Sequence, residues 1–274
     1  ASIGFQTLTN SFEGWVTGVG GTLSPTLKDI VDQHYFDLLE GGVDVTTDLI
    51  GHHPLMWGSD RTVAKVNMSR NLYHLTEVAP TTALTWTAAG NPLPGFKGNG
   101  TDNYLDTGFN AQVTPHGMTA DSQHIGIWLM EKSPSGDPDA GDFDAGSDNR
   151  RLRVQAQGGT GNVVVTGGNA STGGSPDTGH GMIFATSSST PPHHIGGSRN
   201  GSTTATGYSN GLPVIANTFA SVATLPDAMR FIRQNTNFSD RTMSAAHYGL
   251  KLTDAQWLVI YNAIRKTGQL LGAI

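Results

Sequence analysis

Short apolar segments broken by glycine and polar turn residues limit what this chain can fold into, and Phe96 to Asn110 shows the pattern most clearly. In this stretch, FKGNGTDNYLDTGFN, each of the three glycines would cost a helix about 1 kcal/mol relative to alanine. We therefore expect two short strands around a Gly-Asn turn. In the second strand, Tyr104 and Asp106 should lie on one face and Leu105 and Thr107 on the other, because side chains alternate along a strand.

The same pattern extends over the whole chain, in which 36 of 274 residues are glycine and 14% are charged. This composition is typical of many short strands joined by turns and argues against a helical bundle. A net charge of −6 provides no basic surface, so nucleic acid is not an expected partner. There is no cysteine for a disulfide or a thiolate metal site. No apolar run approaches the roughly 20 residues of a membrane-spanning helix, so membrane insertion is not expected.

The region before residue 92 has a different character, and its clearest element is a predicted helix from Pro25 to Glu40. Ser24 is a suitable N-cap, Pro25 fits the first helical position, and two glycines follow Glu40. One apolar face repeats at helical spacing. The chain from residue 44 to 87 shows little periodicity. We therefore expect residues 1–91 to form a helix and an irregular arm for anchoring or assembly, with an assembly interface made by Leu27, Ile30, Val31, Tyr35 and Leu38.

From residue 92 to 274, strand signals recur at the spacing of an antiparallel β-sandwich. Asn210-Gly211 predicts a tight hairpin between two of these strands, and Thr253 with Gln256 predicts a capping box at the start of a C-terminal helix. The expected strands after the opening stretch are residues 124–130, 151–157, 162–166, 181–187, 203–209, 212–217 and 229–234. The predicted fold is therefore mainly β, a jelly-roll sandwich with a helix and arm before it and a helix after it.

Four motifs in this order resemble the concanavalin A-like lectin/glucanase jelly roll, in the form found in bacteriophage virion proteins. They are FKGNGTDNYLDTGFN, AGSDNRRLRV, TATGYSNG and AAHYGLKLTDAQWLVIYNAI. The resemblance covers residues 92–274 and leaves residues 1–91 outside it. It implies a structural or adhesive protein on the virion surface, assembled in the bacterial cytoplasm as a capsid decoration, head fibre, or tail or baseplate component. The implied partners are sister copies in a homo-oligomer, other virion proteins and cell-surface glycans.

Because this fold also carries lectins and enzymes, two alternatives stay open: an extracellular bacterial lectin module, and a glycoside hydrolase with an atypical active site. The glucanases of the fold carry their two catalytic carboxylates on one strand as Glu-x-Asp-x-Glu. The four glutamates of this chain, Glu13, Glu40, Glu77 and Glu131, lie far apart in the sequence and none has an aspartate two residues away. The Gly-x-Ser-x-Gly match at residues 207–211 sits in a predicted hairpin rather than a nucleophile elbow. We therefore expect no enzymatic activity.

Two groups of residues are candidates for binding. Asp137, Asp139, Asp142 and Asp144 lie on a glycine-rich loop and could coordinate Ca²⁺, although aspartate is also a common residue in solvated turns.

For carbohydrate, we expect an exposed Tyr208 beside the hairpin turn, with Arg199 and Asn200 in the neighbouring loop; Trp128 and Trp257 are expected in the core. Most histidines are expected in loops. In the pairs His52-His53 and His193-His194, adjacent side chains on a strand would point to opposite faces, so neither pair should chelate one ion.

Overall fold

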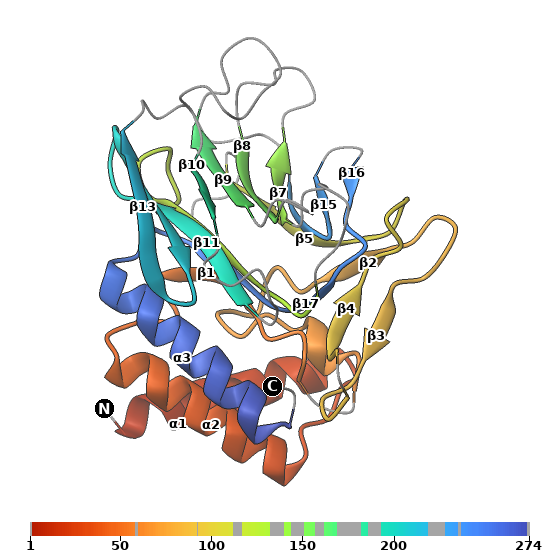
Figure 1. Cartoon of the computed structure of the whole chain (residues 1–274). Coiled ribbons are helices and arrows are strands. Elements are labelled where there is room, and N and C mark those ends of the chain that lie inside the picture. The colour runs from red at the N-terminus through yellow and green to blue at the C-terminus, as the bar shows by residue number, and fades with distance from the viewer. Residues whose placement is uncertain are drawn as a thin grey trace.

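The structure is a computed structural model that describes residues 2–57, 60–91, 93–111, 117–131, 140–143, 151–156, 162–168, 182–185, 193–218, 228–234 and 237–272. Three layers are stacked in this part of the chain: a layer of helices, an eight-stranded sheet (sheet A) and a seven-stranded sheet (sheet B) (Figure 1). All strand pairings described are antiparallel. The predicted fold class, an antiparallel sandwich with helices at both ends of the chain, is confirmed.

Sheet A lies in the middle of the molecule, between the helices and sheet B (Figure 1). In spatial order its strands are β13 (Leu212–Thr218), β12 (Thr204–Ser209), β11 (His193–Arg199), β6 (Gln123–Leu129), β17 (Thr242–Gly249), β4 (Gly95–Lys97) and β3 (Thr85–Thr87), with β1 (Leu49–His53) also paired to β17. The expected turn at Asn210-Gly211 joins β12 and β13, and both residues have positive φ angles, 50° and 79°. That geometry is the type I′ turn that the Asn-Gly dipeptide favours.

Sheet B forms the outer layer on the side away from the helices. Its strands in order are β10 (Met182–Ala185), β9 (Asn162–Gly168), β8 (Arg151–Ala156), β7 (Ala140–Phe143), β14 (Ala228–Phe231), β5 (Tyr104–Asn110) and β2 (Thr76–Val78). A short ribbon of β15 (Arg233–Gln234) and β16 (Asn237–Phe238) lies beside β5 (Figure 1). Large apolar side chains of both sheets, including Phe96, Leu105, Ile127, Phe231 and Tyr248, fill the space between them.

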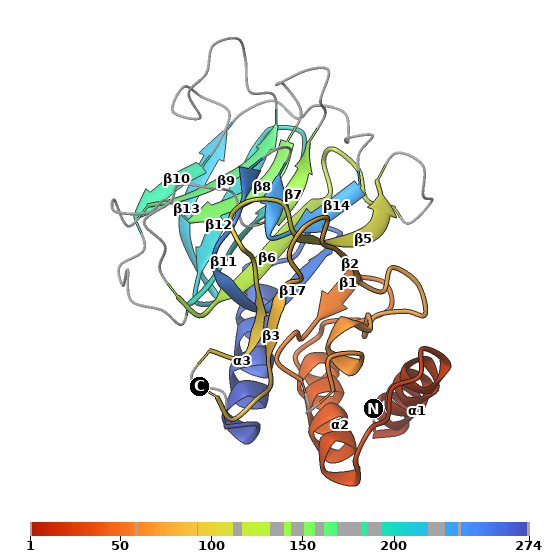
Figure 2. The ribbon, with the colours of Figure 1, turned by 90° about the vertical axis from the view of Figure 1, so that its right-hand side faces the viewer.

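A second apolar core lies between sheet A and the helices. The helices in the described residues are α1 (Ser2–Gly18), α2 (Pro25–Glu40) and α3 (Asp254–Leu270), with a 3₁₀ turn at Val63–Lys65. Figure 2 shows α2 between α3 and α1, beneath the strands of sheet A. Sheet A is therefore buried on both faces, which is why every residue of β6 and β17 is buried. Along β6, Ile125, Ile127 and Leu129 belong to the core between the sheets, and Trp128 belongs to the core under the helices.

The helix predicted from Pro25 to Glu40 is present with the predicted cap, in which the Ser24 hydroxyl accepts a hydrogen bond from the Leu27 amide at 3.2 Å. The role expected for its apolar face is wrong. Leu27, Ile30, Val31, Tyr35 and Leu38 are all buried within this same chain. All of them except Ile30 belong to the core that also contains Phe12, Trp257 and Ile264. This face stabilises the fold of one molecule and is not an assembly interface.

The region before residue 92 is also not a separate arm. Strand β1 pairs with β17, β2 pairs with β5, and β3 pairs with β4, so this region supplies three strands to the two sheets. The expected boundary between residues 91 and 92 does not separate two structural units. These strands were not predicted from the sequence because they are only three to five residues long, too short for an alternating pattern to be recognised.

Candidate functional site

The most promising binding surface lies on the outer face of sheet B, on strands β5 and β14. The alternation expected for β5 is confirmed: Leu105 and Thr107 are buried, and Tyr104 and Asp106 are half-buried on the opposite face. In the register of the two strands, Arg230 of β14 is opposite Asp106. Arg230 therefore joins the same outer face, while its neighbour Phe231 points into the core.

A bend after β14 adds two more side chains to this face. Ile232 has a φ angle of 67°, which is unusual for a β-branched residue. It is fully buried in the core between the sheets, and this burial offsets the backbone strain. Beyond the bend, the β15–β16 ribbon places Arg233 and Phe238 beside Tyr104. We call Tyr104, Asp106, Arg230, Arg233 and Phe238 the Tyr104 cluster.

The Tyr104 cluster combines aromatic rings with guanidinium groups. The guanidinium carbon of Arg233 lies 4.3 Å from the ring centre of Tyr104 and 5.0 Å from that of Phe238. The two ring centres are 6.3 Å apart. The guanidinium carbon of Arg230 lies 5.7 Å from the ring centre of Tyr104. These distances are within the range of cation–π attraction, so the rings hold both arginine side chains in place.

One carboxylate completes the cluster. Asp106 Oδ2 lies 3.6 Å from Arg230 Nε, an ion pair longer than a hydrogen bond, and Asp106 Oδ1 accepts a hydrogen bond of 2.8 Å from the Gly108 amide. Burial lowers the pKa of the Arg233 guanidinium, and the positive charge of Arg230 lowers it further. The cluster therefore offers a ligand fixed donors, a fixed acceptor and aromatic surface, which is the usual combination in a site that recognises a polar small molecule.

The carbohydrate site expected around Tyr208 is not exposed. Tyr208 is 0% exposed; its ring stacks on Trp257 of α3 at 4.4 Å with an interplanar angle of 10°. Its hydroxyl donates a hydrogen bond of 2.7 Å to Asp254. Arg199 is also buried, and its Nη2 donates to the Ser202 carbonyl at 2.8 Å, whereas Asn200 is exposed. Tyr208 fixes α3 to sheet A and has no face left for a sugar.

The Ca²⁺ site expected in the acidic loop falls largely outside the described residues. Asp137, Asp139 and Asp144 are not among them, and for Asp142 only its place in β7 is described. Within the described ranges, no group of three or more His, Asp or Glu side chains is arranged to hold a metal ion.

The expectation of loop histidines is wrong for both histidine pairs. His52 and His53 lie in β1, His193 and His194 lie in β11, and all four are buried. The two members of the first pair do point to opposite faces, since His52 contacts His34 of α2 and His53 lies against Phe231 and Tyr248.

Five buried histidines form a layer between sheet A and the helices, which we call the histidine layer: His34, His52, His124, His194 and His247. His34 Nε2 is 2.7 Å from His52 Nε2, and His194 Nε2 is 2.8 Å from His247 Nε2. Each contact needs one ring nitrogen to donate and the other to accept, so the accepting ring of each pair must be neutral. The contacts are too buried to bind an external ligand and serve the packing of the layers.

Two glutamates are engaged in ion pairs rather than in a catalytic pair. Glu77 binds Arg61 and lies 3.1 Å from Lys65, and Glu131 lies 2.7 Å from Lys97. This arrangement gives neither carboxylate the apolar surroundings or the carboxylate neighbour that a general acid in a glycosidase needs.

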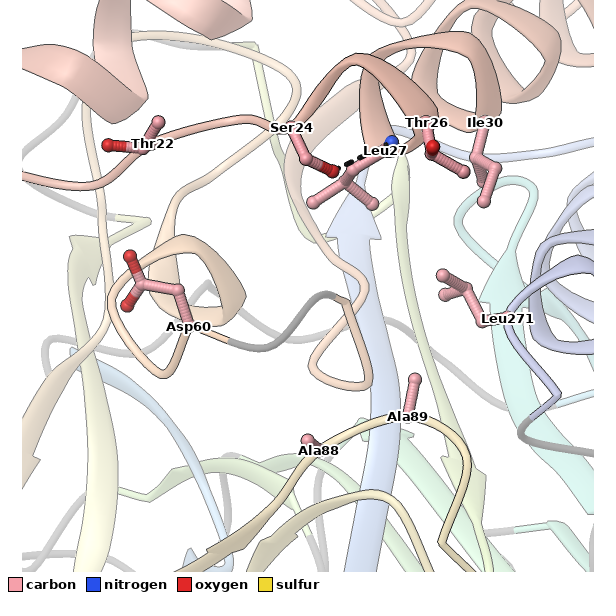
Figure 3. A pocket seen from close by; sticks show the side chains of 9 residues that line it. All are labelled: Thr22, Ser24, Thr26, Leu27, Ile30, Asp60, Ala88, Ala89 and Leu271. Carbon is pink, nitrogen blue, oxygen red and sulfur yellow. Dashed lines mark hydrogen bonds between the residues drawn. The ribbon is translucent and has the colours of Figure 1, made fainter.

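A pocket of about 260 Å³ opens near the start of α2 (Figure 3). Leu27, Ile30 and Leu271 form an apolar side, with Thr26 next to Ile30, and Asp60 lies on the side of Thr22. The Ser24 hydroxyl already caps α2, and Asp60 Oδ1 accepts a hydrogen bond from the Thr62 amide at 2.7 Å. The described residues that line this pocket include no aromatic ring, so it lacks the surface on which sugar rings stack.

No family model matches the sequence, and a search of curated proteins finds no match. The structure, however, resembles solved β-sandwich domains. Domain 4 of an extracellular arabinanase from Geobacillus stearothermophilus, solved in complex with arabinotriose, aligns with a TM-score of 0.51 at 14% identity, over 78% of this chain and 98% of that domain. This likeness shows a shared fold.

Botulinum neurotoxin structures align similarly. The receptor-binding domain of neurotoxin D gives a TM-score of 0.53 at 13% identity, over 80% of this chain and 53% of that chain. A structure of neurotoxin type C aligns with a TM-score of 0.55 at 14% identity, over 80% of this chain and 52% of that chain. Cell entry of this toxin is described as dependent on interaction with two ganglioside molecules. This chain spans about half the length of the toxin chains. The comparisons establish an antiparallel β-sandwich.

None of the helices in the described part of the chain is long and apolar enough to cross a membrane.

Proposed function

We propose that this chain is a non-enzymatic glycan-binding protein whose ligand binds at the Tyr104 cluster on the outer face of sheet B. One observation carries the proposal. Two aromatic rings, two guanidinium groups and one carboxylate come together where β5 and β14 meet the β15–β16 ribbon. Sugars present hydroxyl groups that pair with such donors and acceptors, and apolar C–H surfaces that pack on aromatic rings.

Two further observations support glycans as the ligand class. Structural neighbours of the chain include a domain solved with arabinotriose and a toxin whose cell entry depends on gangliosides. The chain also lacks the Glu-x-Asp-x-Glu motif of the glucanases, and Glu77 and Glu131 are held in ion pairs. Binding without hydrolysis is therefore the activity we expect.

We place this glycan-binding protein on the surface of a bacteriophage particle, as a capsid decoration, head fibre, or tail or baseplate component. The support is the order of the four sequence motifs that resemble jelly rolls of virion proteins. In this role the sandwich would attach the particle to surface sugars of a bacterial cell. We expect peptides of this chain to be found in purified particles of the phage that encodes it. Their absence from those particles would contradict a virion location.

The binding proposal is tested with the purified full chain on a glycan array, followed by calorimetry with the best ligand. We expect Tyr104→Ala and Arg233→Ala to weaken binding about tenfold or more, because each removes contacts at the centre of the site. Arg265→Ala is the matched control, since Arg265 is exposed on α3. Incubation with the bound glycan should release no reducing sugar. An array without any bound glycan, or equal losses in all three variants, would overturn the proposal.

A further inference from the structure

Two positively charged side chains share one aromatic ring in the Tyr104 cluster. Arg233 and Arg230 approach the ring of Tyr104 at 4.3 and 5.7 Å, and Phe238 holds Arg233 from a second ring at 5.0 Å. Like charges brought this close repel each other. The charge of Arg230 accordingly contributes to lowering the pKa of the Arg233 guanidinium, after burial.

The carboxylate of Asp106 contacts one of the two arginines. Its Oδ2 is 3.6 Å from Arg230 Nε, so the two groups make a loose ion pair without a short hydrogen bond. Its other oxygen accepts from the Gly108 amide at 2.8 Å, which keeps the carboxylate directed toward its own strand. Among the described side chains of this cluster, two guanidinium groups face one carboxylate.

We propose that the Tyr104 cluster selects acidic sugars, in which a carboxylate of a sialic acid or uronic acid residue binds between Arg230 and Arg233. This inference rests on the proposed glycan-binding function and names the class of glycan. A guanidinium group matches a carboxylate with two parallel N–H donors, which a neutral sugar cannot use in the same way. The two rings already hold Arg233, so little side-chain entropy is lost when the carboxylate binds.

The test compares acidic sugars with their neutral parents by calorimetry on the full chain. The pairs are sialyllactose with lactose, and trigalacturonate with galactotriose. We expect the acidic member of at least one pair to bind on the order of tenfold tighter, because hydrogen bonds between charged groups exceed those between neutral ones. Its affinity should fall as salt rises from about 0.05 to 0.5 M, while the affinity of the neutral parent should change little.

Variants then assign the preference to the two arginines. Arg230→Gln and Arg233→Gln should each lower the affinity for the acidic sugar to the affinity for its neutral parent. Arg230→Lys and Arg233→Lys, which keep the charge, should retain part of the preference, and this result separates a lost charge from a lost fold. Arg265→Gln on α3 is the control and should change nothing. Thermal melting of each variant checks that it is folded.

The outcomes distinguish the two proposals. If neutral and acidic sugars bind equally well, or if the double variant Arg230→Gln/Arg233→Gln keeps the preference, the selection of acidic sugars is wrong and glycan binding stands. If neither type binds and the array is also empty, the glycan-binding function itself is wrong.

Discussion

At the scale of single residues, two tyrosines differ from each other in how they are covered by the rest of the fold. Tyr208 lies beside the Asn-Gly hairpin turn, where an exposed ring is expected, yet its ring is buried under α3 against Trp257. Tyr104 lies in a glycine-rich stretch and is half-buried on the outer face of sheet B. The difference depends on which face of each sheet another layer covers, and no local pattern contains that information.

The structural role of Tyr208 predicts a loss of stability without a loss of binding. Tyr208→Phe removes the hydroxyl that donates to Asp254 at 2.7 Å and keeps the stacked ring. We expect the free energy of unfolding to fall by about 1 kcal/mol in urea titrations, because the hydrogen bond has a charged but exposed acceptor. Glycan affinity should be unchanged. If Tyr208→Phe instead loses glycan binding and keeps its stability, Tyr208 takes part in binding.

Part of the candidate site could be predicted from the sequence. The alternation in residues 104–107 correctly assigns Tyr104 and Asp106 to one face. The arginines could not be added, because Arg230 is opposite Asp106 only through the pairing of β14 with β5, more than a hundred residues apart in the chain. Long-range pairing of this kind is set by the topology of the whole sandwich.

At the scale of elements, glycines in sheet A explain how α3 packs. Gly126 and Gly196 are directly opposite each other on β6 and β11. A Cβ on Gly196 would lie 2.6 Å from Trp257 Cη2, and one on Gly126 would lie 3.0 Å from the same atom. The two glycines therefore form a hollow into which the ring of Trp257 fits. They also weakened the strand signal of β11, so the sequence did not predict this strand.

Filling that hollow should destabilise the protein. Gly196→Ala brings a methyl group against Trp257 and against the backbone of Ile125, and overpacking of this kind costs about 1–3 kcal/mol. Gly14→Ala is the matched control, since Gly14 is exposed on α1 with open space around its Cα. It should be neutral or stabilising by up to about 1 kcal/mol, because alanine favours helix. Urea unfolding of both variants measures the difference, and equal stabilities would contradict this packing.

Other elements escaped prediction for related reasons. Helix α1 is rich in threonine and glycine, which are weak helix formers. Its stability comes from tertiary packing of Phe12 and Val16 against the second core. Strand β17 consists largely of small residues and histidine, TMSAAHYG, although it is a central strand of sheet A. Its low apolar content follows from close packing on both faces.

At the scale of the whole molecule, the histidine layer joins the helices to the sandwich. Histidines of α2, β1, β6, β11 and β17 meet there, together with Trp257 and Thr267 of α3. Burial lowers the pKa of His34 and His124 to about 4 and that of His194 to about 3, and lowers the pKa values of His52 and His247 well below the usual range. Near neutral pH, the layer is therefore uncharged.

Stability should fall when the medium becomes acidic. Below about pH 6.5 the unfolded chain binds protons at these histidines while the folded chain does not, so protons favour unfolding. Each histidine then contributes a slope of up to about 1.4 kcal/mol per pH unit until its folded pKa is reached. Once both rings of a pair are protonated, two N–H groups face each other and the hydrogen bond between the rings is lost.

Urea titrations between pH 8 and pH 5 measure this effect before most carboxylates titrate. We expect constant stability from pH 8 to about 7 and a progressive loss from about pH 6.5 downward. A free energy of unfolding that stays constant or rises over that lower range would show that the histidine layer is already charged or open to water in the folded state.

The central claim, that glycan binds on the outer face of sheet B, is tested most directly by hydrogen–deuterium exchange of the full chain with and without the best-binding glycan. Amides of β5 and β14, together with those of Arg233 and Phe238, should exchange more slowly in the presence of glycan. Amides of α2 and of Ala88 and Ala89, around the pocket of Figure 3, should not change. Slower exchange around that pocket, with none on β5 and β14, would contradict the claim.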